Sequence, residues 1–115
     1  MALNLKPLIW NWSPIVAGDT YPAANIVESA HTENLDRVRI KLRISGSTTT
    51  ALTLDSDTTG IVINNAAAWD FTISEIDTTS LATGVYSYQL ETTTTGGTIR
   101  TEFAGTWPIL SDTTP

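Results

Sequence analysis

Hydrophobic and polar residues alternate with a period of two along several segments of the chain, most clearly over residues 36–45. Four aliphatic residues there alternate with four cations, namely Val38, Ile40, Leu42 and Ile44 with Arg37, Arg39, Lys41 and Arg43. Successive side chains of a β-strand point to opposite sides of the sheet. The pattern therefore predicts a strand with one buried face and one solvent-exposed basic face.

Six further segments have the pattern of short strands: residues 8–12, 52–54, 61–63, 69–73, 85–92 and 98–109. Turns containing glycine separate several of them, at residues 46–48, 57–60 and 95–97. We expect the third and fourth of these segments to pair as a hairpin. Pro14 is expected to confine the N-terminal strand to a sheet edge, and Gly105 and Pro108 to mark a bulge or an edge.

The segment 80–88 leaves two interpretations open. A glycine turn that leads into a strand whose early tyrosine bonds back to the backbone is the tyrosine corner of Greek-key sandwiches, and Gly84 and Tyr86 fit it. Alternatively, Tyr86 and Tyr88 are ordinary core aromatics. Residues 74–81 can hold at most one helical turn. About seven strands at this turn spacing predict an all-β fold, specifically an immunoglobulin-like antiparallel β-sandwich.

The composition agrees with a β-rich fold, because 41% of the residues are hydrophobic, 16% are charged and threonine is abundant. A chain of 115 residues is long enough for one core. We expect a single β-sandwich domain over residues 1–115, with 1–16 as an edge or docking strand and 111–115 as a short tail. The chain contains no cysteine, so packing rather than disulfides is expected to stabilise it.

The formal net charge of −6 argues against nucleic acid and against a membrane surface as partners, because both interactions require clustered lysine and arginine. Polar residues and prolines interrupt the apolar run of residues 1–16. We therefore expect neither an export signal nor a transmembrane span. Synthesis and folding in a bacterial cytoplasm is the simplest expectation.

Few residues suggest catalysis or metal binding. The only histidine, His31, lies in a polar stretch without a nucleophile motif, as expected of a solvated loop residue. Most acidic residues occupy turns, where aspartate bonds its own backbone, and no pair has a spacing typical of acid–base chemistry. Residues 55–60 resemble the start of a calcium loop, but Ala66 stands where such a loop needs a bidentate glutamate. We expect no enzymatic activity, no cofactor and no metal.

Six residues are candidates for a protein interface: Trp10, Trp12, Arg37, Arg39, Lys41 and Arg43. The two tryptophans either complete the core or attach the domain to a neighbour, and the proline in this terminal strand favours the interface. The basic stripe either docks an acidic partner or glycan, or forms cross-strand ion pairs with acids such as Glu91 and Glu102. Ion pairing on a solvated sheet face is the favoured interpretation.

Four motifs follow one another along the chain: Gly18-Asp19-Thr20-Tyr21-Pro22, the alternating strand Leu35–Ile44, Leu81-x-x-Gly84-x-Tyr86-x-Tyr88-x-Leu90, and Gly97-x-Ile99-x-Thr101-x-x-x-Gly105. In this order they resemble a family of small tailed-bacteriophage virion accessory proteins, and they are similar to the N-terminal domains of phage baseplate upper proteins. Residues 25–34 depart from that family, because they are polar where it has a second apolar strand.

The resemblance implies a non-catalytic structural component of the bacteriophage particle, serving in capsid decoration, in the neck, or in tail or baseplate attachment. It implies a homo-oligomer whose partners are other virion proteins and whose final location is the virion. The alternative is a carbohydrate-binding or adhesive sandwich module in which exposed tryptophan and tyrosine rings stack on sugars.

Overall fold

The computed structural model describes residues 8–28 and 32–111, and this part consists of strands, turns and loops without a helix. The strands are β1 Leu8–Ile9, β2 Ile15–Val16, β3 Thr20–Tyr21, β4 Ala24–Val27, β5 Leu35–Ile44, β6 Leu52–Asp55, β7 Ile61–Asn65, β8 Asp70–Ile73, β9 Ile76–Asp77, β10 Gly84–Thr94 and β11 Ile99–Leu110. The predicted all-β class is confirmed, with eleven strand segments in the described residues where about seven are expected. Within the described part, no helix has the length and apolarity of a membrane span.

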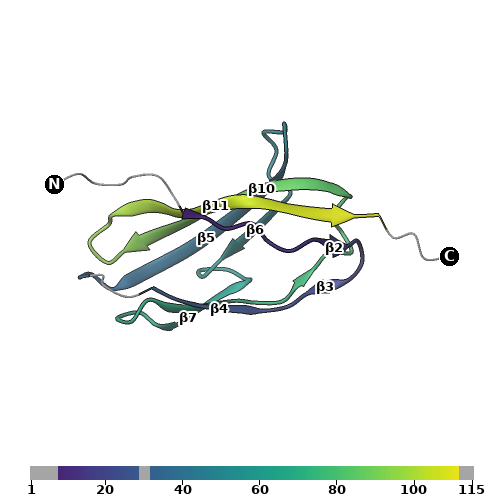
Figure 1. The fold of residues 1–115 in the computed structure, drawn as a ribbon. Coiled ribbons are helices and arrows are strands. Elements are labelled where there is room, and N and C mark those ends of the chain that lie inside the picture. Colours follow the sequence, from purple (N-terminus) through teal and green to yellow (C-terminus); the bar gives the residue numbers. More distant parts are fainter. Residues whose placement is uncertain (1–7, 29–31, 112–115) are drawn as a thin grey trace.

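The larger sheet has the strand order β1-β11-β10-β5-β6, and β2 also pairs with β11 (Figure 1). β10 is antiparallel to both β5 and β11, and Gly97, with φ of 89°, allows the tight turn between β10 and β11. β1 and β2 run parallel to β11. β1 thus lies at the sheet edge, as Pro14 predicts. The prediction of a purely antiparallel sandwich is wrong, because residues 8–16 follow β11 in the same direction.

The second layer contains the three-stranded sheet β4-β8-β7 and the two-stranded sheet β3-β9. These strands lie below the larger sheet and face it across the interior (Figure 1). β7 and β8 form the predicted hairpin. β4 includes residues 25–27 of the stretch 25–34, where the sequence predicts no apolar strand. Its inner residue Ile26 packs against the core while Asn25 bonds to polar side chains at the surface, so one apolar position suffices for this edge strand.

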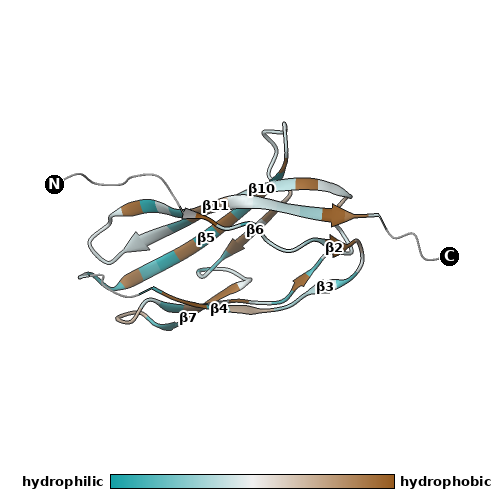
Figure 2. Cartoon of the chain, in the orientation of Figure 1, coloured by the Kyte–Doolittle hydropathy of each residue, from teal (hydrophilic) through white to brown (hydrophobic). Residues whose placement is uncertain are grey.

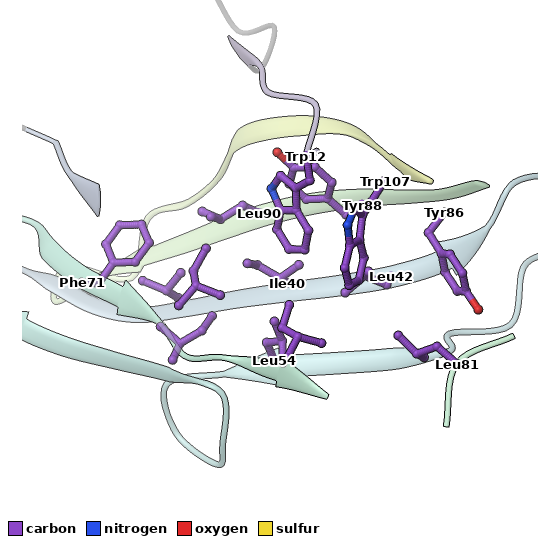
Figure 3. Packing of buried hydrophobic residues seen from close by; sticks show 14 of the residues in the cluster. Trp12, Ile40, Leu42, Leu54, Phe71, Leu81, Tyr86, Tyr88, Leu90 and Trp107 are labelled. Carbon is purple, nitrogen blue, oxygen red and sulfur yellow. The ribbon is translucent and has the colours of Figure 1, made fainter. Parts of the chain in front are cut away.

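The core fills the space between the two layers (Figure 3). Its largest fully buried side chains are Trp69, Trp107, Tyr86, Phe71, Ile40, Leu42, Leu90 and Val38. On β5 the aliphatic residues Val38 to Leu42 are completely buried, whereas Ile44 at the strand end is 36% exposed. The hydropathy bands along β5 follow this alternation (Figure 2). The two-sided strand predicted for residues 36–45 is therefore confirmed.

The tyrosine corner is confirmed as the connection that crosses between the layers before β10. The Tyr86 hydroxyl donates a hydrogen bond of 2.7 Å to the backbone oxygen of Ala82. Gly84, with φ of 146°, starts β10 in a conformation that residues with a side chain rarely adopt. The stretch 74–81 before it holds strand β9 and no helical turn.

Candidate functional site

Trp12 is a core residue and not part of an exposed interface. Its side chain is 4% exposed, and its ring centroid lies 4.6 Å from that of Tyr88 and 5.2 Å from that of Trp107. Tyr21 from the opposite layer stacks on it at 5.9 Å. Figure 3 shows Trp12, Tyr88 and Trp107 together beneath β11. The interface predicted for Trp12 is wrong because four aromatic rings from both layers meet here and exclude solvent.

The N-terminal segment is held against β11 by backbone hydrogen bonds. Trp10 N donates to Ala104 O and Trp12 N donates to Thr106 O, both at 2.9 Å. The hydroxyl of Tyr88 donates to the carbonyl of Trp10, and burial raises the pKa of this phenol. A Cβ at Gly105 would lie 2.1 Å from Trp10 O. Gly105 therefore permits the close approach of the N-terminal segment to β11.

The predicted bulge in β11 lies a few residues before Gly105. The register between β10 and β11 shifts between Leu90 and Glu91, where Leu90 faces Phe103 and Glu91 faces Thr101. Glu102 is the extra residue on β11.

Trp10 differs from Trp12 because it is only partly buried, with edge-on contacts to Phe103 and Trp12. It borders an apolar hollow of about 440 Å³ between the N-terminal segment and the second layer. The walls of this hollow include Trp10, Pro14, Ile15, Tyr21, Ile73 and Ile76. The hollow leaves part of the Trp10 and Tyr21 rings accessible.

The outer face of β5 carries the four predicted cations, and its first half is neutralised by acids. Arg37 donates two hydrogen bonds to the Asp55 carboxylate, at 2.5 and 3.0 Å. Arg39 forms an ion pair of 2.8 Å with Glu91 on β10. The cross-strand pairing expected for Glu91 is confirmed. Glu102 is instead on β11 and lies 3.8 Å from Arg100, so its predicted role opposite β5 is wrong.

Asp55, at the start of the calcium-like stretch 55–60, is the partner of Arg37. It ends β6, where Arg39 is its register partner, and it is 3% exposed. The hydrogen bond from Arg37 holds the pKa of this carboxyl below its ordinary value of 3.8, against the effect of burial. The alternation of Leu52 and Leu54 with polar residues predicts strand β6. Whether Asp55 contacts Arg37 depends, however, on the length of β6 and on its register against β5.

The second half of the same face has cations without acidic partners. Lys41 lies opposite Gln89 on β10 and Thr53 on β6, and Arg43 lies opposite Ser87. Neither cation forms an ion pair with any residue in the described ranges 8–28 and 32–111.

These cations border a hollow of about 480 Å³, whose lining also includes the Arg39–Glu91 ion pair and continues over Ala104 and Gly105. We call this region, formed by Lys41, Arg43, Ser87 and Gln89, the basic groove.

Two further acidic groups that could suggest chemistry, Asp70 and Asp55, have local structural partners. Asp70 accepts hydrogen bonds from Asn25 and Asn64, which lower the pKa of its carboxyl. Asp55, the first residue of the stretch 55–60 that resembles a calcium loop, binds the Arg37 guanidinium. No group of three metal-ligating side chains occurs among the residues that the structure describes. His31 lies outside them, as do residues 1–7 of the expected docking strand and 112–115 of the expected tail.

Comparisons of the chain with protein-family models, curated proteins and solved structures gave no match.

Proposed function

We propose that the chain is a non-catalytic structural component of a bacteriophage particle that acts through protein–protein contacts, with an immunoglobulin-like sandwich as its scaffold. The motif order along the sequence supports the phage assignment. The strand order β1-β11-β10-β5-β6 opposite β4-β8-β7 supports the scaffold, because sandwiches of this type set a sheet of this connectivity against a three- or four-stranded one. The tyrosine corner at Tyr86 supports it independently.

The observation that carries the contact function is the basic groove. Lys41 and Arg43 are the β5 cations whose cross-strand neighbours are neutral, in a chain of net charge −6. A stable sheet face gains little from unpaired cations, whereas a docking surface gains specificity and a faster association rate from them. The groove is therefore the part of the candidate interface that we assign to partner binding.

The non-catalytic part of the proposal rests on how the perturbed ionisable groups are used. Catalytic groups have shifted pKa values in clefts where a substrate fits. Here the shifted carboxyls of Asp55, Asp70 and Asp77 each serve a local hydrogen bond. The phenol of Tyr86 closes the tyrosine corner. Each shift is thus accounted for by folding.

Quantitative mass spectrometry of gradient-purified particles tests the role in the virion. We expect the chain at a stoichiometry of many copies per particle, made in the host cytoplasm and incorporated during assembly. Particles that form normally without the chain bound would overturn the proposal. A paired variant K41E/R43E should be lost from the particles while K6E/R100E, which changes the net charge equally, should be retained.

The alternative, a carbohydrate-binding or adhesive module, is favoured by the apolar hollow at Trp10 and Tyr21. Partly exposed aromatic rings beside a hollow are the usual platform for sugar rings. A glycan array would support this function if it gave specific binding that Trp10→Ala abolishes and Trp10→Phe retains. Trp12 is unsuitable for that test because its removal disturbs the core.

A further inference from the structure

The cations of the basic groove have a spacing that fits an extended acidic segment. Lys41 and Arg43 occupy alternate positions of one strand, so their Cα atoms are about 6.6 Å apart. A second extended segment laid along β5 presents its own alternate side chains at the same interval. Two carboxylates separated by one residue would therefore face Lys41 and Arg43 in register.

The chain itself exposes such a pair of carboxylates. Glu75 and Asp77 flank the buried Ile76 of β9, so both point away from the core and both are exposed. Asp19, also exposed, is next to Thr20, which pairs with Asp77. None of these three acids forms an ion pair within the described part of the chain.

The Asp77 carboxylate has one oxygen bound locally and one that accepts no hydrogen bond from a described residue. Both of its hydrogen bonds, from the backbone nitrogen and the hydroxyl of Thr79, end on Oδ1. They lower the pKa of the carboxyl. The second oxygen, Oδ2, accepts no hydrogen bond from a described residue.

The distribution of charged residues along the chain favours a second copy of this chain over an unrelated partner. β5 carries four of the six lysine and arginine residues, while eleven of the twelve acidic residues lie outside it. Arg37 and Arg39 are neutralised by Asp55, Asp57 and Glu91, so the excess positive charge of β5 is confined to Lys41 and Arg43. No exposed aromatic ring of the kind that sugars stack on contributes to the basic groove, since Tyr88 is 2% exposed and faces the core. Charge and spacing together favour a protein segment.

We propose that copies of this chain associate head to tail, with Glu75 and Asp77 of one copy docked on Lys41 and Arg43 of the next. The proposal rests on the structural role proposed above and names its partner. The two patches are different surfaces, so the contact is heterologous and generates a ring where the rotation closes and a filament where it does not. Both forms suit a component present in many copies.

Sedimentation velocity of the full chain at increasing concentration tests the contact. We expect concentration-dependent oligomers that dissociate when sodium chloride is raised from about 50 mM to about 500 mM, because salt screens exposed charge pairs. K41E/R43E and E75K/D77K should each weaken self-association about tenfold or more, as expected for the loss of two exposed ion pairs. K6E/R100E has the same net charge as K41E/R43E and should associate like the unchanged chain.

Mixing the two charge-reversed variants gives the decisive result. K41E/R43E has two acidic patches and E75K/D77K two basic ones, so neither associates alone, but the mixture should form alternating oligomers. Oligomers that persist unchanged in both variants, or a mixture that stays monomeric, would overturn the head-to-tail contact. If the chain is monomeric at every concentration yet occurs in purified particles, this contact is wrong and the structural role stands.

Discussion

The two regions that the sequence marks as interfaces behave in opposite ways. Trp12 is enclosed by rings from both layers, whereas the cations of β5 stand on the outer face of the larger sheet. Both regions follow a period of two, so periodicity alone does not separate them. The two regions differ in whether the second layer packs against them. The parallel pairing of residues 8–16 with β11 turns the tryptophan toward a second layer, while nothing in the second layer reaches the outer side of β5.

The largest effect is expected where this comparison is clearest, at Trp12. Trp12→Ala should lower the free energy of unfolding by about 3–5 kcal/mol, because it removes a large ring from a packed core. Trp10→Ala should cost clearly less, since Trp10 is only partly buried. Urea unfolding followed by circular dichroism measures both. Equal losses of unfolding free energy in the two variants would show that Trp12 is not a core residue.

The second largest effect on stability is expected on the charged face of the larger sheet, at Asp55. Its folded-state pKa lies below 3.8, so the ionised carboxylate stabilises the fold above about pH 3.8, and this contribution disappears as the pH falls through the lower folded-state value. Asp55→Asn should therefore reduce stability at pH 7 and flatten its decline in acid. Asp57→Asn is the matched control, because Asp57 is 59% exposed and 3.4 Å from Arg37. Thermal unfolding between pH 2 and pH 7 separates the two variants.

A smaller effect is expected at the tyrosine corner. Tyr86→Phe removes one partly buried hydrogen bond, to Ala82, and should cost about 1 kcal/mol. Tyr21→Phe loses only an exposed bond from the backbone of Ser13 and should cost less. Chemical denaturation of both variants at neutral pH provides the comparison. A Tyr86 variant as stable as the unchanged chain would mean that ring packing alone holds the corner.

The long strands were predictable because each of them carries its own signal. β5 and β10 are long enough for the alternation of apolar and polar residues to be recognised. Gly96-Gly97 marks the hairpin turn between β10 and β11. β1, β2, β3 and β9 contain two residues each, too few for any period. Trp69 continues the alternation of β8 but lies in the preceding turn with φ of 53°, where its indole donates to Glu33 O. Such details depend on tertiary contacts.

The candidate site was predictable to the same extent. The basic face of β5 and its pairing with Glu91 follow from alternation and cross-strand geometry. The pairing of Arg37 with Asp55 depends on the register of β6, and the unpaired state of Lys41 and Arg43 depends on which residues of β10 and β6 face them. Register is a property of the folded sheet, so residue types alone do not determine it.

The smallest expected effect completes the comparison. Lys41→Gln with Arg43→Gln should change the free energy of unfolding by no more than about 0.5 kcal/mol, because both side chains face neutral neighbours on the solvent side. The same change should weaken the salt-sensitive self-association measured by sedimentation, by less than the charge-reversed K41E/R43E does because glutamine adds no repulsion. If these substitutions instead destabilised the fold as strongly as Trp12→Ala, the cations would belong to the scaffold. Unchanged stability with weakened association would mean that β5 builds the core with one face and meets its partner with the other.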